Sequence, residues 1–498
     1  MNIFTYTVDE PLLFTQLYFW IFLLAVLSVF AIIKNKPKAA HLCLLAVSLF
    51  FYYKSSGNFV ILLVITTLLT YGISLWMDKV KNRKAKKFLL FTGILFDTVF
   101  LLYFKYTYFF IDIANSWFSS DIQPQDYLSL FVNNSFGTSF SVDKIILPVG
   151  ISFYSFQAIS FLADKYKGRL KEKTSLLDFA FYLTFFPQLV AGPIVRADVF
   201  LPQIKEKYSL TAYDFSFAFF LILKGLVKKF FVSDYISVNF VDRIFNSPDT
   251  FTGMENLLAT YGYTMQIYCD FSGYTDIAIA VSLLFGFHLP MNFNSPYKAV
   301  TITDFWHRWH ISLSTWLRDY IYIPLGGNRK GKLRQYLNLM TTMLVGGFWH
   351  GADIKFVFWG GMHGLLLVVD KLIKPLTDKI TKKSVGRFVL AFITFHLVNT
   401  LWIFFRAGNF QTALTVMTRA LHADLSSLIP VVSAYIKPLS VIILALAIHI
   451  LPSKIKIGYK DWFCQTPMPV KIVVAVIVIF VLVQVKGSAI QPFIYFQF

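Results

Sequence analysis

Four of the nine histidines in this chain lie in one stretch, residues 292–364, and His350 has the most unusual neighbours among them. It stands in the segment GGFWHGA, with glycines before and after it. Glycine lets a backbone or a ligand approach closely, and a neutral imidazole can accept a proton from a hydroxyl group. An ionisable side chain in a long apolar run is a functional candidate. We therefore expect His350 to be a general base, and the alternative is a histidine that links two helices by hydrogen bonds.

His310, in the segment DFWHRWHIS, is the second candidate. Trp306 and His310 are four residues apart and would share one face of a helix. His307 and His310 are three apart and could hold a metal, but no nearby cysteine or carboxylate completes a ligand set, so no metal site is predicted. Asp304 and Arg308 are either substrate contacts or an ion pair on the helix surface.

Four further residues are weaker candidates. His363 follows His350 by 13 residues on a glycine-rich apolar run, where a packing role is expected alongside a possible place in a substrate path. Trp349 directly precedes His350 and is a second candidate for that path. Asp270 and Asp276, in QIYCDFSGYTDIAIA, either line a polar pathway or cap the start of a helix, and both readings stay open.

The composition places these residues in a membrane protein. Of 498 residues, 56% are hydrophobic and only 15% are charged, whereas soluble domains carry about 25% charged residues. The net charge of +19 falls in short loops between apolar runs, a pattern that orients membrane helices and does not indicate nucleic-acid binding. The three cysteines are too far apart for a disulfide framework or a zinc motif.

Apolar runs of membrane-spanning length recur along the whole chain, and we expect about 11 to 13 transmembrane helices. The basic segment 78–87 and the segment 112–143, which has no lysine or arginine, lie at opposite ends of one run. The positive-inside rule then places 78–87 in the cytoplasm and the N-terminus outside. The expected runs are 14–33, 39–53, 58–77, 88–110, 145–165, 215–231, 256–287, 337–352, 355–370, 388–405, 436–452 and 470–486.

Two segments do not read as ordinary spans. Residues 179–196 are apolar but broken by Pro187, Gly192 and Pro193, which is typical of a re-entrant segment as much as of a full span. Residues 301–335 are amphipathic and basic, so we expect them at the cytoplasmic face, with Thr303 or Asp304 as a helix cap. The chain is predicted to be a single all-α membrane domain, 1–498, with N-terminal helices in 1–110, a core in 145–370 and C-terminal helices in 388–498.

Several motifs together resemble the membrane-bound O-acyltransferase superfamily, and most of all its bacterial alginate and peptidoglycan O-acetyltransferase branch. The likeness runs from about residue 50 to the end. The motifs are LPVGISFYSFQ (147–157), FFPQLVAGPIVR (185–196), QIYCDFSGYTDIAIA (266–280), NFNSPY (292–297), DFWHRWHISLSTWLRDYIYIPLGGNR (304–329), GGFWHGA (346–352), WGGMHG (359–364) and FIYFQF (493–498).

The resemblance implies a helical fold around a central tunnel, with His350 as the catalytic residue and His310 as its partner. It implies acetyl-coenzyme A or another acyl thioester as the cytoplasmic donor, no bound cofactor, and a cell-surface or exported polysaccharide as the acceptor. It also implies the cytoplasmic membrane of a bacterium and an esterase-like partner protein outside that membrane.

Two competing functions remain. D-alanyl transfer to teichoic acid from a carrier-protein thioester is disfavoured because family members of that kind are usually shorter. A secondary transporter could use Asp270, Asp276 and the histidines as a relay, but no inverted repeat is visible in the sequence.

Overall fold

Helices form all the regular structure in the part of the chain that the computed structural model describes, residues 6, 11–138, 140–170, 172–189 and 192–485. The all-α membrane fold predicted from the sequence is confirmed. The motif FIYFQF at 493–498 lies outside the described residues.

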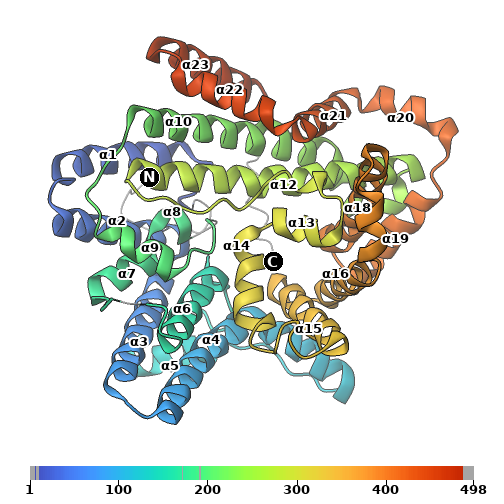
Figure 1. The fold of residues 1–498 in the computed structure, drawn as a ribbon. Helices are drawn as coiled ribbons and strands as arrows, with labels where there is room; N and C mark the ends of the chain where they lie inside the picture. The colour runs from blue at the N-terminus through green and yellow to red at the C-terminus, as the bar shows by residue number, and fades with distance from the viewer. Residues whose placement is uncertain (1–5, 7–10, 139, 171, 190–191, 486–498) are drawn as a thin grey trace.

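The N-terminal helices surround one side of the molecule (Figure 1). They are α1 (Leu17–Ile33), α2 (Pro37–Ser56), η1 (Gly57–Phe59), α3 (Val60–Lys79), α4 (Arg83–Phe118), α5 (Tyr127–Phe136), α6 (Ile151–Tyr166), α7 (Leu176–Thr184), α8 (Phe186–Leu189) and α9 (Ala197–Ile204). The middle of the chain supplies the central helices. These are α10 (Ala212–Leu226), η2 (Val227–Asp234), η3 (Ser237–Val241), α11 (Asp242–Asn246), η4 (Pro248–Thr250), α12 (Gly253–Leu284), η5 (Pro296–Lys298), α13 (Ile302–Arg308), α14 (Ile311–Leu317) and η6 (Arg318–Tyr322).

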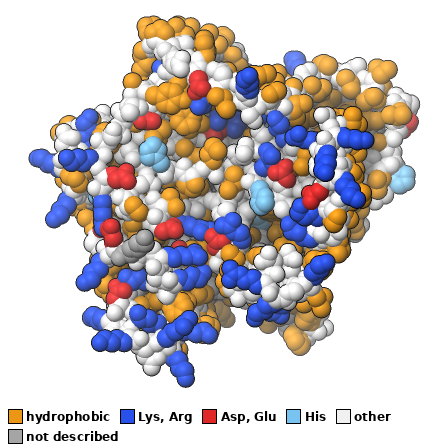
Figure 2. Space-filling view, in the orientation of Figure 1, with side chains coloured by type: hydrophobic (Ala, Val, Ile, Leu, Met, Phe, Trp, Pro, Cys, Tyr) orange, Lys and Arg blue, Asp and Glu red, His pale blue; other side chains and the backbone are white. Residues whose placement is uncertain are grey.

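The last third of the described chain closes the other side. It contains α15 (Lys332–His350), α16 (Ile354–Leu372), α17 (Lys374–Ile380), α18 (Ser384–Arg406), α19 (Phe410–Leu421), η7 (Leu425–Ser427), α20 (Leu428–Ala434), α21 (Ile436–Ile450), α22 (Ser453–Gln465) and α23 (Met468–Val485). Many hydrophobic side chains are exposed on the surface of the molecule. Figure 2 shows one face, where they lie together with many Lys and Arg side chains. A lipid environment accounts for exposed apolar surface of this extent.

Fewer helices than expected are long and apolar enough to cross a bilayer. In the described chain they are Pro37–Lys79, Arg83–Phe118, Gly253–Leu284 and Ser384–Arg406, and three bent helix pairs raise the number to seven. The expected count of about 11 to 13 is higher because several apolar runs form short or bent helices. The run 436–452, for example, forms the 15-residue α21, and 39–53 and 58–77 are joined through η1 into one continuous arm.

The central element is α12, which crosses the middle of the molecule beside α10 (Figure 1). Its start is fixed by a capping box, in which Thr252 and Glu255 bond each other's backbone N–H groups. Most of its 32 residues are buried, polar ones included, so the helix is surrounded by protein. Gly225 of α10 and Gly273 of α12 face each other, and a Cβ atom at Gly225 would lie 2.7 Å from the Gly273 carbonyl oxygen. Small residues at this contact let the two backbones touch.

A second glycine contact closes the hairpin of α15 and α16. A Cβ atom added at Gly360 would lie 2.9 Å from the Cα atom of Gly347, and one added at Gly347 would lie 2.9 Å from the Cα atom of Gly360. His350 follows Gly347 by three residues, and His363 follows Gly360 by three. The close approach of the two backbones therefore sets how far apart the two histidine-bearing turns can lie.

We expect Gly360→Ala to destabilise the protein by about 1–3 kcal/mol, because the added methyl group overpacks a backbone contact. Gly361→Ala is the matched control, since its Cβ atom would meet only the Leu344 side chain at 3.4 Å, an ordinary contact. Thermal unfolding of both purified variants in one detergent measures the difference. Equal melting temperatures for the two variants would show that the hairpin tolerates a wider spacing.

Candidate active site

His310 occupies the turn between α13 and α14 and is completely buried. Its backbone is left-handed, with φ 43° and ψ 55°, a conformation that costs about 1–3 kcal/mol for a residue with a side chain and is frequent at functional sites. The strained turn is held by Asn292, whose carbonyl oxygen accepts the N–H of Ile311 at 3.0 Å. The sequence placed His310 within a helix, and the structure places it at the break between two.

The side chain of Asn292 binds His310 as well. Its Oδ1 atom lies 3.2 Å from His310 Nδ1 and also accepts the N–H (3.1 Å) and the hydroxyl (2.9 Å) of Ser312. Because Oδ1 can only accept, the proton of the neutral imidazole is assigned to Nδ1, and Nε2 is then the basic nitrogen. The hydroxyl oxygen of Ser312 in turn accepts the N–H of Ile194 at 3.0 Å, which ties this group to the segment before α9.

His350 is the last residue of α15, and only 3% of its surface is exposed. Aromatic rings enclose it: the ring centroids of Trp349, Trp359 and Phe405 lie 5.0, 5.2 and 5.3 Å from that of the imidazole. The Trp349 ring is also 6.3 Å from that of His310. The structure therefore brings the two predicted histidines together, with one indole beside both. This aromatic enclosure keeps bulk water away from a reaction at the imidazole.

His363 and Trp306 form a second layer behind His350. The Trp359 ring contacts His350 at 5.2 Å on one side and His363 at 4.6 Å on the other. Trp306 meets His363 at 5.2 Å, and Phe305 stacks on the same imidazole at 6.1 Å. Among the described residues, neither ring nitrogen of His363 has a hydrogen-bond partner. Aromatic packing around His363 is as expected, while its two buried nitrogens are not satisfied by the described residues.

The remaining residues of 301–310 are structural. Arg308 Nε and Asp304 Oδ1 form an ion pair at 2.7 Å, as the four-residue spacing predicted. The cap of α13 is Thr301, which accepts the N–H of Asp304 at 3.1 Å, so the expected cap at Thr303 or Asp304 is wrong by two or three positions. His307 is exposed while His310 is buried, and the two cannot chelate one ion.

Asp270 and Asp276 lie inside α12 and pair with lysines of the preceding segment. Lys229 Nζ is 2.6 Å from Asp270 Oδ1, and Lys224 and Lys228 lie 3.0 and 2.7 Å from the two oxygens of Asp276. Helix capping is therefore wrong for both, because α12 begins at Gly253. Lys229 lies in the π-helical η2 and is 1% exposed, so Asp270 compensates a deeply buried charge.

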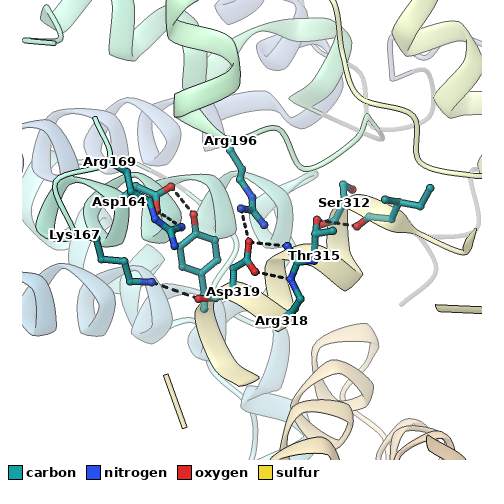
Figure 3. A network of polar contacts seen from close by, with 10 residues as sticks. Asp164, Lys167, Arg169, Arg196, Ser312, Thr315, Arg318 and Asp319 are labelled. Carbon is teal, nitrogen blue, oxygen red and sulfur yellow. Dashed lines mark hydrogen bonds and ion pairs between the residues drawn. The ribbon is translucent and has the colours of Figure 1, made fainter. Parts of the chain in front are cut away.

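A polar network joins three segments that are far apart in the chain (Figure 3). Asp319 receives Arg318 Nε and Arg196 Nη1, each at 2.6 Å. The Tyr320 hydroxyl donates to Asp164 Oδ2 at 2.5 Å, and Arg169 reaches the other oxygen of that carboxylate at 3.1 Å. The network anchors η6, and α14 before it, to α6 and to the segment before α9.

The charge on Asp319 is stabilised by its partners. Burial acts to raise the pKa of this carboxyl group, but the hydrogen bonds from Arg318 and Arg196 outweigh burial and hold the pKa below its usual value. The carboxylate is therefore ionised at neutral pH and bridges two guanidinium groups.

A cavity of about 290 Å³ lies beside this network, away from the histidines. Its lining is strongly charged and includes Arg169, Lys173, Asp198 and Lys205. None of the histidines lines it.

Three residues that sequence reasoning passed over complete the site. Asn292 was inside a quoted motif but was not singled out, because its bond to His310 depends on a turn that periodicity does not reveal. Lys105 donates to the carbonyl oxygens of Trp349 (2.7 Å) and His350 (2.9 Å). It carries the only charge between residues 98 and 111, and that isolation in an apolar run was the available signal. Arg196 gave no such signal.

Comparisons with known proteins show which sequences this chain is similar to. A sequence profile described as the membrane-bound O-acyltransferase family matches residues 47–407. A peptidoglycan O-acetyltransferase of Helicobacter pylori is 36% identical over 409 residues, which cover 77% of this chain and 74% of that protein. A probable alginate O-acetylase of Pseudomonas putida is 38% identical over 382 residues, 76% of this chain and 74% of that protein. A teichoic acid D-alanyltransferase of Bacillus subtilis is 32% identical over 273 residues, 51% of this chain and 67% of that protein.

We expect Asp319→Asn to cost about 2–4 kcal/mol, since it removes the charge that holds two guanidinium groups at a buried position. Asp378→Asn is the control: Asp378 pairs with Lys374 at 2.6 Å, but both side chains are 61% exposed, and such pairs contribute about 0–1 kcal/mol. Unfolding of both variants in a detergent titration measures the two losses. A loss at Asp319 no larger than at Asp378 would contradict the anchoring role of the network.

Proposed function

This chain belongs to the membrane-bound O-acyltransferase family, and we propose that it moves an acetyl group from a cytoplasmic thioester across the membrane for the O-acetylation of a polysaccharide. The observation that carries the proposal is the burial of His310 and His350 around Trp349, inside an aromatic shell. Neutral imidazoles in such a site are suited to proton transfer during acyl transfer. Membership of this enzyme family argues against the secondary transporter considered above.

His350 is the general base in this proposal. Its imidazole takes the proton of the acceptor hydroxyl while the oxygen attacks the thioester carbonyl carbon. The new C–O bond forms as the C–S bond breaks, and the imidazole returns the proton to the sulfur, so the donor leaves as a free thiol. His310, fixed at Nδ1 by Asn292 Oδ1, orients the reacting groups through Nε2. No bound cofactor and no metal takes part in this scheme.

The proposed donor is acetyl-coenzyme A, which would enter a central tunnel from the cytoplasm. The segment 301–335, which we expect at the cytoplasmic face, supports donor entry from that side. Its exposed residues Arg329, Lys330 and Arg334 would attract the phosphates of an anionic donor. We place the chain in the cytoplasmic membrane of a bacterium, with the N-terminus outside. An esterase-like partner beyond the membrane would carry the acetyl group to the polysaccharide.

Two polysaccharide acceptors are favoured, alginate and peptidoglycan, because the relatives that match about three quarters of this chain are named for them. D-alanyl transfer to teichoic acid is the weaker alternative, since the D-alanyltransferases match only 51% of this chain.

We expect His350→Ala to lower acetyl transfer by about 10²-fold to 10⁴-fold, the contribution of a general base. His310→Ala should lower transfer less, and His363→Ala least, while all three variants keep normal melting temperatures. The assay uses purified protein in liposomes, labelled acetyl-coenzyme A, and alginate oligosaccharide or a peptidoglycan fragment, each with and without a candidate partner protein. Substantial transfer by the His350 variant would remove it as the base, and transfer only from a D-alanyl carrier thioester would replace the acetyl donor.

The orientation is tested at the two ends of α4. Residues 78–87, at the start of α4, carry six positive charges. The segment 112–143, which begins near the end of α4, carries only negative charges. In a variant without Cys43, Cys269 and Cys464, a single cysteine at 84 should resist a membrane-impermeant maleimide on intact cells, whereas one at 121 should react. The opposite labelling would invert the orientation and place the proposed donor on the wrong side.

A further inference from the structure

Two adjacent residues of α4 bind three consecutive carbonyl groups at the end of α15. The Tyr106 hydroxyl donates to the carbonyl oxygen of Phe348 at 2.6 Å. The Lys105 ammonium group donates to those of Trp349 and His350 at 2.7 and 2.9 Å. The Tyr106 ring also stacks on Phe348, with ring centroids 4.2 Å apart. We call Lys105 and Tyr106 the α4 clamp.

The clamp binds backbone carbonyl groups of a kind that is left without partners at every helix C-terminus. The last carbonyl groups of a helix lack partners within it and form the negative end of its dipole, so a cation there is favourable. In the described part of the chain, the Lys105 ammonium group contacts these two oxygens and lies 5.7 Å from the centroid of the Trp349 ring, and it forms no ion pair with a carboxylate. A lysine in an apolar helix is costly, and an ion pair does not account for this one.

The backbone departs from helical geometry directly after His350. Gly351 leaves the helix at once, with φ −165° and ψ 153°. A Cβ atom there would collide with the Phe356 ring, so the backbone passes close under that side chain. The turn that carries His350 is thus the last of α15. Terminal turns open more readily than helix interiors unless something binds their free groups.

We propose that Lys105 is a positioning residue for acyl transfer, which fixes the backbone of His350 and so the place of its imidazole. This inference rests on the proposed role of His350 as the base. Lys105 does not touch the reacting atoms in this scheme; it acts through the two carbonyl groups. Displacement of a reacting group by about 1 Å can cost about 10²-fold in rate, which sets the size of effect to look for.

The kinetic test compares Lys105→Met, Lys105→Arg and a matched control, Lys471→Met. Lys471 is another lysine that binds a backbone carbonyl group: it is buried and donates to Ser216 Oγ (2.6 Å) and to the carbonyl oxygen of Cys464 (3.1 Å), but it lies in the peripheral α23. In the liposome assay, Lys105→Met should lower kcat by about 10-fold to 10²-fold with a nearly unchanged KM for acetyl-coenzyme A. Lys105→Arg should recover part of the loss, and Lys471→Met should keep the normal kcat. Equal losses from both methionine variants would overturn the proposal.

A second measurement needs no acyl transfer at all. Hydrogen exchange followed by mass spectrometry reports the opening of the peptide 344–352. Lys105→Met should speed exchange in 344–352 several-fold and leave exchange in α12 peptides unchanged. Lys471→Met should leave exchange in 344–352 at its normal rate. Tyr106→Phe removes only one hydroxyl group from the clamp and should give a smaller increase in the exchange rate of 344–352. This variant keeps the test valid if Lys105→Met does not fold. Unchanged exchange in 344–352 would overturn the clamp even if kcat falls. If the unaltered protein transfers no acetyl group but exchange still responds, the proposed function fails and the clamp stands.

Discussion

The left-handed turn at His310 is the constraint on which the rest of the site depends. A residue with a Cβ atom adopts this backbone only where the surrounding structure compensates the strain. Here Asn292 supplies the compensation twice, through its carbonyl oxygen to Ile311 and through Oδ1 to His310 and Ser312. The turn separates α13 from α14 and directs the imidazole toward Trp349 instead of along a continuous helix.

Buried polar groups elsewhere follow the same logic, because neither water nor lipid can satisfy them. Lys229 is held by Asp270 and Asp234, and Asp319 by Arg196 and Arg318. The Lys229–Asp270 and Arg196–Asp319 pairs join segments that are distant in sequence, so satisfying these charges also determines which helices meet. The molecule uses glycine contacts for close approach and buried charge for alignment.

Some of this could be predicted from residues alone. His350 and His310 were recognisable because imidazoles are rare between tryptophans and glycines in apolar runs, and the Asp304–Arg308 pair followed from helical spacing. The partners were not recognisable: Lys105 is 245 positions from His350, and no periodicity connects them. Fewer apolar runs form long, straight helices than the sequence predicted, because an apolar run has the same composition whether its helix is straight or bends inside the protein. Asp270 and Asp276 were ambiguous until the lysines opposite them were located.

The hairpin of α15 and α16 has a consequence for how the protein is made. Its glycine contact joins residues only 13 apart, so the hairpin can form as soon as it leaves the ribosome and the insertion machinery. The groups that it contacts, Lys105 and Tyr106 of α4 and the ring of His310, stand earlier in the chain and are therefore made before it. The histidines therefore come together late in biogenesis, when a finished hairpin docks against waiting helices. A chain interrupted before this step would carry His310 and its turn but no second histidine, and so would be released without a working centre.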